Sequence, residues 1–240
     1  AMVTFKLENR DKANLYLNGK KAGEIRGKLD KALREGKYKV EVREDLADKS
    51  YYYFSDTIEV FDGDMTTVSI EMKQKYTEEY YIQNQQYEEY LKKYPNGKYA
   101  SQAKTEKANV IKNISKNMVA VEGGTFYMGS NESSDEKPIH NVTLDSFYIG
   151  KYEVTQAEFG AVMGYNPSNF SGGRNPVEQV SWYDAVMYCN ELSKREGLTP
   201  YYDISGIEKD GNRIKSADVT ISGGNGYRLP TEAEWEYGAR

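Results

Sequence analysis

The 240-residue sequence holds one short stretch in which acidic side chains stand close enough together to do chemistry, "YRLPTEAEWEYGAR" at residues 227–240. Glu232, Glu234 and Glu236 alternate with other residues along it. Such carboxylates could provide an acid and a base, ligate a metal ion, or lie in the first turn of a helix. Each interpretation implies a different kind of protein.

The position of Thr231 favours the helix start. Thr231 precedes Glu234 by three residues, which is the spacing of a capping box, in which side chain and backbone of the two residues bond reciprocally. Glu232 falls in the same first turn, where the helix dipole stabilises an acid. We therefore expect a structural role for these carboxylates, with Trp235 anchoring the helix in the core.

Two further helix starts follow the same rule. Thr155 precedes Glu158 in "VTQAEFGAVMG", and Ser181 precedes Asp184 in "VSWYDAVMYC". Each box contributes on the order of 1 kcal/mol, so the three together define where three helices begin. The ends expected for the first two helices are Gly164 and Gly197.

The chain contains one cysteine and one histidine, the residues that most often act as nucleophile and base. Cys189 shares a helical face with Val186 and Leu192, so we interpret it as a small core residue. His140 lies in an alternating sequence with Val142 and is interpreted as a strand residue. Neither has a catalytic partner in the local sequence.

Other ligand-binding patterns are weak. The glycine pairs at 123–124, 172–173 and within 222–226 lack phosphate-loop spacing and are interpreted as turns. One cysteine permits no internal disulfide, and one cysteine with one histidine supplies no zinc ligand set. These patterns identify no catalytic, cofactor-binding or metal-binding residue among residues 1–240.

The composition disfavours some classes of binding partner. A net charge of -5 argues against a nucleic-acid binder, because phosphate binding needs a concentrated basic surface. No apolar run reaches membrane-spanning length. The opening "AM" has the character of a cloning remnant, so the lack of an export signal carries little information.

The hydrophobic period divides the chain into three segments. Residues 1–73 alternate with period two and contain an Asn18-Gly19 hairpin turn, which predicts a small β-sandwich. Residues 74–116 show helical spacing broken by "YPNG", which predicts a helical hairpin. Residues 117–240 combine glycine pairs, aromatic strands and short capped helices.

Two of these segments are similar to known modules. The order "LYLNGKKAGE…EGKYKVEV…TVSIEM" resembles the PEGA domains of bacterial envelope proteins, although Ile25 and Arg26 stand where that motif has proline. "YLKKYPNGKYASQAK" resembles the helix-turn-helix of tetratricopeptide-like repeats. A single hairpin cannot build a solenoid, so a spacer packed against its neighbours is the alternative.

The third segment resembles the formylglycine-generating-enzyme family, also called the sulfatase-modifying-factor domain. Three blocks carry the resemblance in order: "MVAVEGGTFYMGSNESSDEKPIHNVTLDSFYIGKYEVTQAEF", "NPVEQVSWYDAVMYCNELSKREGL" and "GYRLPTEAEWEYGAR". The resemblance implies a variant of the C-type-lectin fold. The expected class is thus α+β: a β-sandwich at 1–73, a helical hairpin at 74–116, and the N-terminal half of such a domain at 117–240.

The same resemblance implies where chemistry would lie. Some family members oxidise a sulfatase cysteine to formylglycine with copper and a cysteine pair, and many are not enzymes. The cysteine pair and the calcium-binding loops lie downstream of "RLPTEAEWE", so calcium or copper would bind only through residues beyond Arg240. Cys189 matches a non-catalytic cysteine. Without the second half of the domain, apolar surface on Phe126, Trp182 and Trp235 is expected to be exposed or covered by a partner.

These observations predict a non-catalytic bacterial envelope protein whose C-type-lectin-like domain binds a protein or a glycan. The alternative is a fragment of a copper-dependent formylglycine-generating oxidase that acts on sulfatase cysteines. A third hypothesis is a structural subunit of an envelope machine. The expected location is the bacterial periplasm or cell surface, with lipid anchoring through a removed N-terminal signal, no membrane span and no nucleic-acid partner. The sequence does not determine the oligomeric state.

Overall fold

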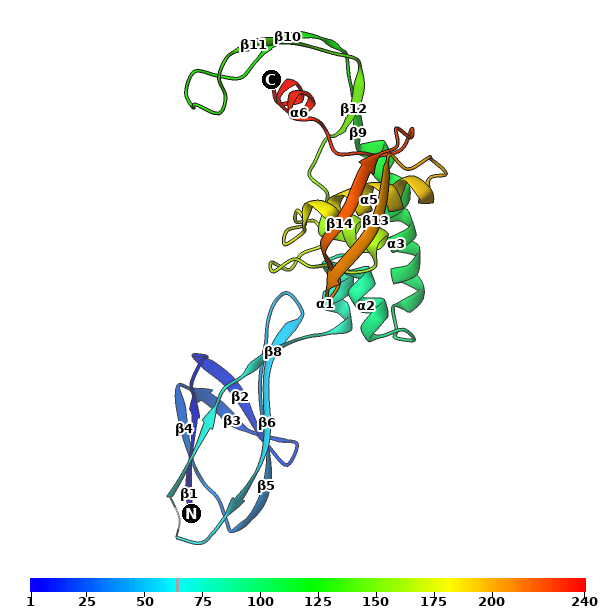
Figure 1. Ribbon diagram of the computed structural model, residues 1–240. Helices are drawn as coiled ribbons and strands as arrows, with labels where there is room; N and C mark the ends of the chain where they lie inside the picture. Colours follow the sequence, from blue (N-terminus) through cyan, green and yellow to red (C-terminus); the bar gives the residue numbers. More distant parts are fainter. Residues whose placement is uncertain (64) are drawn as a thin grey trace. The chain divides into compact units, whose positions relative to one another are not determined.

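The computed structural model describes residues 1–63 and 65–240, and it divides into two compact units, Ala1–Tyr81 and Ile82–Arg240 (Figure 1). The first unit is built mainly of strands, and the second combines helices with pairs of short strands. The predicted α+β class is confirmed. Each unit has a buried hydrophobic cluster of its own, which is what an independently packed unit requires.

The strands of the first unit form one hydrogen-bonded sheet of eight strands, in the order β7-β1-β4-β3-β2-β5-β6-β8. Neighbouring strands are antiparallel except β1 and β7, which are parallel. The bounds are β1 (Met2–Leu7), β2 (Lys12–Leu17), β3 (Lys20–Arg26), β4 (Lys28–Ala32), β5 (Gly36–Asp45), β6 (Ser50–Val60), β7 (Met65–Ile70) and β8 (Lys73–Tyr76).

This sheet folds over itself, which is how it produces the predicted sandwich. β3 and β4 share only the residue pair Arg26 and Lys28, so the sheet turns a corner there. The strands β7-β1-β4 make one layer, and β3-β2-β5-β6-β8 make the other, which we call the five-stranded layer. Alternate side chains of both layers point inward, as a period of two dictates. The buried cluster between them includes Phe5, Leu15, Ile25, Val40, Val42 and Ile70.

The hairpin turn between β2 and β3 is the one that the sequence predicts. Asn18 and Gly19 both have positive φ, 51° and 77°, which are the conformations that asparagine and glycine tolerate best. The Asn18 side chain also accepts a hydrogen bond of 2.8 Å from the Lys39 backbone N–H. The turn is therefore held to the neighbouring strand β5.

The helical hairpin differs from its prediction in the first arm. In place of one helix, the chain forms β8 and then two short helices, α1 (Glu78–Gln83) and α2 (Tyr87–Lys93). Gln85 between the helices has a φ of 56°, and the Asn84 carbonyl accepts a 2.6 Å hydrogen bond from the Gly173 N–H. A left-handed residue interrupts the helical ladder, and this distant contact accompanies the break. The second arm is the expected continuous helix, α3 (Ala100–Ile114).

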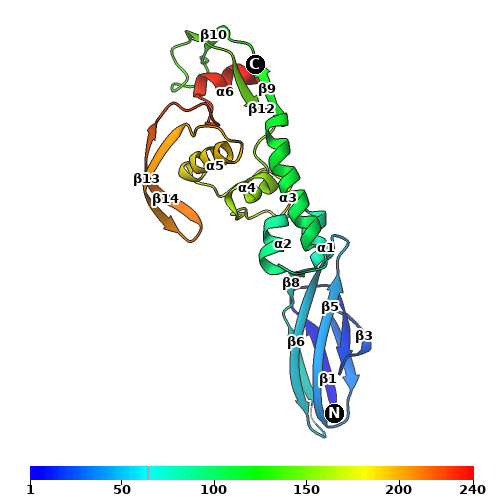
Figure 2. The same ribbon diagram turned by 90° about the vertical axis from the view of Figure 1, so that its right-hand side faces the viewer.

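The rest of the second unit consists of three antiparallel strand pairs and three helices. The pairs are β9 (Met118–Val121) with β12 (Phe147–Gly150), β10 (Gly124–Met128) with β11 (His140–Leu144), and β13 (Tyr202–Asp210) with β14 (Arg213–Ile221). A 3-10 turn, η1 (Ser115–Asn117), connects α3 to β9, and the helices are α4 (Gln156–Met163), α5 (Trp182–Arg195) and α6 (Glu232–Ala239). Figure 2 shows α6 beside β10, α4 next to α3, and α5 next to α4.

All three predicted capping boxes are present. Thr155, Ser181 and Thr231 each accept a hydrogen bond from the backbone N–H three residues later, and the acid there bonds back to the cap. Gly164 ends α4 in the left-handed conformation, with a φ of 79°. The helices begin where the sequence predicts because these bonds satisfy N–H groups that have no partner within the helix.

The helices α4 and α5 pack through aromatic rings. Phe159 of α4 stacks on Tyr188 of α5 with ring centroids 5.7 Å apart. The buried cluster around them contains Ile114, Phe159, Val162, Val186, Tyr188, Cys189, Leu192 and Tyr202. Within the described residues, no helix combines the length and the apolar character that crossing a bilayer requires.

Asp184 does more than close a capping box, because its carboxylate is fully buried and connects three segments. One oxygen accepts from the Ser181 backbone and side chain, at 2.9 Å each. The other accepts from the Tyr165 hydroxyl and from the Ile214 N–H, also at 2.9 Å. The start of α5, the segment after α4 and the start of β14 are therefore held by one side chain.

This arrangement predicts the effect of Asp184→Asn. Both carboxylate oxygens accept N–H and O–H bonds, so an amide must turn its NH₂ toward another donor and leave that donor buried and unpaired. We expect a loss of about 2–3 kcal/mol in the free energy of unfolding, measured by urea denaturation. Glu191→Gln is the control, because Glu191 is half-buried on the same helix and forms a surface ion pair with Lys194, and it should cost under about 0.5 kcal/mol. Equal losses for the two variants would contradict this role.

Candidate functional site

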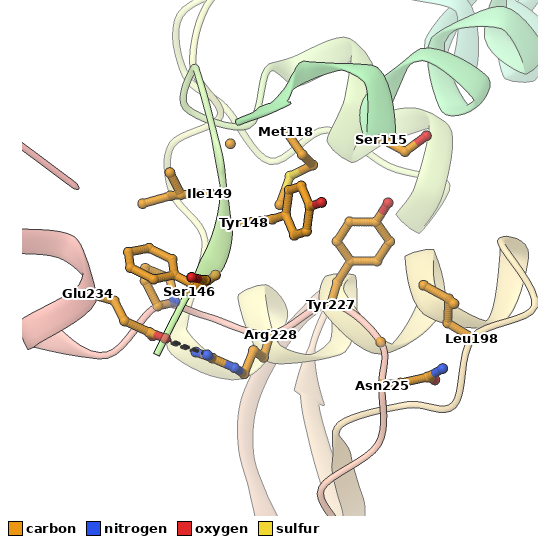
Figure 3. Close-up of a pocket in the computed structure, with 14 residues that line it drawn as sticks. Ser115, Met118, Ser146, Tyr148, Ile149, Leu198, Asn225, Tyr227, Arg228 and Glu234 are labelled. Atoms are coloured by element: carbon orange, nitrogen blue, oxygen red, sulfur yellow. Dashed lines mark hydrogen bonds and ion pairs between the residues drawn. The ribbon is translucent and has the colours of Figure 1, made fainter. Parts of the chain in front are cut away.

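The second unit contains a cavity of about 510 Å³ between η1, β12 and the segment before α6, which we call the tyrosine cavity (Figure 3). Figure 3 shows Tyr148 and Tyr227 on facing sides of it, with Met118 beside Tyr148. The side chain of Tyr148 is exposed. The lining residues that carry side-chain polar groups are Ser115, Ser146, Tyr148, Asn225, Tyr227, Arg228 and Glu234.

Arg228 and Glu234 form an ion pair in the wall of this cavity (Figure 3). The guanidinium donates to both carboxylate oxygens, at 2.7 and 2.5 Å, in the bidentate geometry that arginine favours. Glu234 also accepts from the Thr231 N–H at 2.8 Å. The Arg228 side chain, together with these hydrogen bonds, lowers the pKa of the buried Glu234 carboxyl to about 2. The pair therefore fixes the start of α6 against the segment before it.

Tyr227 is held in place from both ends. Its backbone N–H donates to the Ser193 hydroxyl at 2.8 Å, and its phenol donates to Glu196 at 2.8 Å. Burial, and then the hydrogen bond to Glu196, raise the pKa of the Tyr227 phenol. Both partners belong to the end of α5 and the residue after it. The ring of Tyr227 is thus a fixed wall of the cavity.

A second cavity of about 460 Å³ adjoins the first, and we call it the apolar cavity. Met118, Ile149 and Pro230 border both cavities. The helices α4 and α5 form much of its wall, so residues of the buried cluster border it. Its apolar lining includes Val154, Phe159, Val177, Val180, Ala185, Tyr188, Cys189, Leu192, Leu229 and Trp235.

The prediction that Trp235 anchors α6 in the core is wrong. Its side chain is 64% exposed and borders the apolar cavity. The physical reason is that the capping box and the Arg228–Glu234 pair already fix α6, so the ring does not need burial to hold the helix. Trp182 is 53% exposed at the start of α5, whereas Phe126 is half-buried and contacts Tyr237. Apolar surface is therefore exposed at both tryptophans, as expected.

Two polar side chains of α5 face apolar surroundings. The Tyr188 hydroxyl is buried and has no hydrogen-bond partner among the described residues. The neighbouring Cys189 is buried as expected, and burial raises the pKa of its thiol to about 12. A thiol with this pKa carries almost no thiolate at neutral pH, so it is a poor nucleophile.

The remaining sequence candidates lie outside these cavities. His140 begins β11, is exposed, and its Nδ1 lies 2.9 Å from the Pro138 carbonyl oxygen. Glu236 accepts from the Gly129 N–H at 3.0 Å and so links α6 to the end of β10. Glu232 lies exposed in the first turn of α6. Across residues 1–63 and 65–240, no group of three or more His, Cys, Asp and Glu side chains is arranged to hold a metal ion.

Sequence reasoning missed the cavities themselves. Tyr148 and Tyr227 are separated by 79 positions in the sequence, and no local pattern marks them as facing each other. Arg228 lies in the same stretch as Glu234, six positions before it, but no local pattern predicts that the two side chains form a bidentate pair. The one usable signal in the sequence was an arginine a few positions before an acid, which could have suggested an ion pair.

Comparison with known proteins gives the following matches. The model of the family described as the sulfatase-modifying factor enzyme 1-like domain matches residues 100–240. A protein of Paenibacillus barcinonensis named chaperone protein LppX is 52% identical over 132 residues, which are 52% of this chain and 46% of that protein. A formylglycine-generating enzyme of Mycobacterium tuberculosis is 28% identical over 154 residues, 51% of each chain.

Among solved structures, variable protein 1 of Treponema denticola is 34% identical, with 51% of each chain covered and a TM-score of 0.43. The chain spans about half the length of each of these three relatives.

The Arg228–Glu234 pair predicts a specific pH dependence of stability. The folded pKa of Glu234 is about 2, below the ordinary value of 4.5, so the pair contributes stability above pH 4.5 that is lost as the pH falls toward 2. We expect Glu234→Gln to lower the free energy of unfolding by about 2–3 kcal/mol at pH 7. Urea denaturation should show this difference shrinking steadily between pH 4.5 and pH 2.

The control is Glu232→Gln, in the same helical turn but exposed. It removes the same charge from the helix start and should cost no more than about 0.5 kcal/mol, with little change over this pH range. A pH-independent loss in Glu234→Gln would show that the ion pair is not its cause.

The environment of Cys189 predicts an unreactive thiol. In the folded protein at pH 8, Ellman's reagent should react with Cys189 far more slowly than with a free thiol, because the thiolate is scarce and the sulfur is buried. In urea the same protein should react at the rate of the free thiol. Rapid reaction of the folded protein would contradict the burial.

Proposed function

The chain belongs to the family of the sulfatase-modifying factor enzyme 1-like domain, and on that premise we propose that it is a non-catalytic binding protein. The ligand is a segment of polypeptide with apolar side chains, and the site is the apolar cavity. The observation that carries this proposal is a cavity of about 460 Å³ in which core residues and an exposed tryptophan form the wall. Such concave apolar surface typically marks a ligand or protein site.

Trp235 is well placed to contribute binding energy. Tryptophan is enriched among the residues that dominate protein interfaces, because a large ring buries much apolar area in one contact. Its ring stands on α6, which the Arg228–Glu234 pair and the capping box hold in place. Because the helix that carries the ring is already held in place, ordering this backbone on binding costs little conformational entropy, and more of the contact energy becomes affinity.

The neighbouring strands favour polypeptide over other ligands. β12 pairs with β9 only, in a two-stranded sheet, among the strands that the structure describes. Ile149 and Gly150 of β12 border both cavities. A peptide can add to an unpaired strand edge through its backbone while its side chains enter pockets beside that edge. The similarity to a protein named a chaperone supports the same ligand class.

Two features support a role without catalysis. Cys189 is buried with a raised pKa, which disfavours attack on a substrate. Glu234 is held in an ion pair, and Glu236 bonds to backbone and to Arg240, so both carboxylates have structural partners. The C-type-lectin-like fold and a location in the bacterial periplasm or at the cell surface are part of this proposal. The resemblance of residues 1–73 to PEGA domains supports that location and stays a prediction.

The second candidate is a copper-dependent formylglycine-generating oxidase that acts on sulfatase cysteines, with copper or calcium bound by parts of the domain outside these 240 residues. The similarity to enzymes that carry this name favours it. A cysteine-containing sulfatase peptide, incubated with the copper-loaded protein, would gain an aldehyde detectable by mass spectrometry. That product would overturn the non-catalytic proposal.

The proposal predicts that Trp235→Ser weakens polypeptide binding at least about tenfold, because the complex loses the aromatic ring that the polypeptide covers. The probe is reduced, carboxymethylated lactalbumin, which is unfolded and exposes apolar segments. Binding is measured by fluorescence anisotropy of a dye on the probe. Trp182→Ser is the matched control, since Trp182 is also exposed on a helix but borders neither cavity, and its affinity should stay within about twofold. Equal effects of both variants, or no binding by the original protein, would reject the proposal.

A further inference from the structure

The outer face of the five-stranded layer in the first unit has a composition of its own. Strand register determines which side chains share this face, because directly paired residues point to the same side. Tyr53 pairs with Arg43 on β5 and with Lys73 on β8. Phe54 pairs with Val42, and both belong to the core on the other side. The face opposite the core is therefore polar, cationic and aromatic.

Every acid on this face is already neutralised. Each one forms an ion pair with a cation of the same face: Glu24 with Arg26 at 2.6 Å, Glu41 with Lys39 at 3.1 Å, Asp45 with Arg43 at 2.6 Å and Glu59 with Lys37 at 3.9 Å. The face also carries exposed lysines that form no ion pair with any residue the structure describes, namely Lys12, Lys21, Lys73 and Lys75. The face is thus positive, although the whole chain has a net charge of -5.

The uncompensated lysines lie at the two sides of the layer. Lys73 and Lys75 are on the edge strand β8, whereas Lys12 is on β2 and Lys21 is on β3. With neighbouring strands about 4.8 Å apart, β8 and β2 are separated by about 14 Å. A ligand that reaches both groups must cross the strands and carry negative charges spaced along its length.

Tyrosines fill the middle of the face. Tyr51 and Tyr53 lie on β6 with ring centroids 6.3 Å apart, and Tyr16 lies on β2. The Arg43 guanidinium is 4.1 Å from the Tyr51 ring centroid, and the Lys75 ammonium is 4.8 Å from that of Tyr53. These contacts hold the aromatic rings and the cations in one layer. Asn14, Ser55 and Thr57 add hydrogen-bonding groups between them.

From this arrangement we propose that the outer face of the five-stranded layer binds an acidic polysaccharide. Its carboxylates would meet the lysines at the two sides, and its sugar rings and hydroxyls would meet the tyrosines and the polar side chains between them. Aromatic rings, hydroxyls and amides can contact sugars without bearing charge, so the middle of the face suits neutral sugars between acidic ones.

Other anionic partners fit less well. A nucleic acid carries a charge on every phosphate and needs a concentrated basic surface, whereas this face has few uncompensated lysines on a chain of net charge -5. A membrane surface would favour exposed tryptophan, phenylalanine or leucine beside the lysines. The register places none of those residues on the outer face of these strands. A sparsely charged, hydroxyl-rich polymer matches what is present.

The test measures binding of the full chain to hyaluronate, which has a carboxylate on every second sugar, by isothermal titration calorimetry at low salt. The variant is Lys73→Gln with Lys75→Gln, which removes the uncompensated charges of β8. We expect affinity to fall about tenfold or more and to depend less steeply on salt concentration, since two cationic contacts are lost. Both lysines are exposed, so circular dichroism should show an unchanged fold.

The control is Lys6→Gln with Lys28→Gln, which removes the same formal charge from directly paired, exposed positions on the other layer, where Lys6 forms an ion pair with Glu8 at 3.1 Å. Its affinity should stay within about twofold of the original protein. Equal losses in both double variants would overturn the proposal, because they would reflect net charge alone. It would also be overturned by no binding to hyaluronate, by equal binding to neutral dextran, or by tighter binding to an oligothymidylate of similar length.

Discussion

The second unit depends on one buried carboxylate, that of Asp184. This carboxylate caps α5. It also accepts a hydrogen bond from the Tyr165 hydroxyl, in the segment after α4, and one from the Ile214 N–H at the start of β14. A buried charge is costly unless hydrogen bonds surround it, and here both oxygens are satisfied. Because α4 and α5 form much of the wall of the apolar cavity, the shape of the cavity rests on this side chain.

The Arg228–Glu234 pair holds a further part of the apolar cavity's border, the helix α6. It fixes the start of α6, so Trp235 stands over the apolar cavity with its ring exposed. An exposed tryptophan on a rigid element is unfavourable in water and becomes favourable when a ligand covers it. The same constraints thus explain both the stability of this region and its proposed use as a binding surface.

The sequence predicted the features that depend on local spacing. The starts of three helices could be predicted at Thr155, Ser181 and Thr231, because a capping box lies within four residues. The hairpin turn at Asn18 could be predicted because it depends on two adjacent residues. The role of Trp235 was predicted wrongly, because apolar character alone does not tell whether other contacts already hold a helix.

Features that depend on distant contacts could not be predicted. The break between α1 and α2 accompanies a hydrogen bond to Gly173, nearly ninety positions further along the chain. The cavities arise where η1, β12 and the segment before α6 meet, and no period in the sequence encodes that meeting. The excess of lysines on the five-stranded layer also appeared only once strand register assigned each charge to a face.

The central claim is that a polypeptide binds at the apolar cavity and along the free edge of β12. Hydrogen exchange followed by mass spectrometry, with and without an unfolded polypeptide in excess, tests it most directly. Our account predicts slower exchange in β12 and at the start of α6, with no change in β13 and β14. Unchanged exchange in β12 and α6, or a uniform change over the whole second unit, would contradict it.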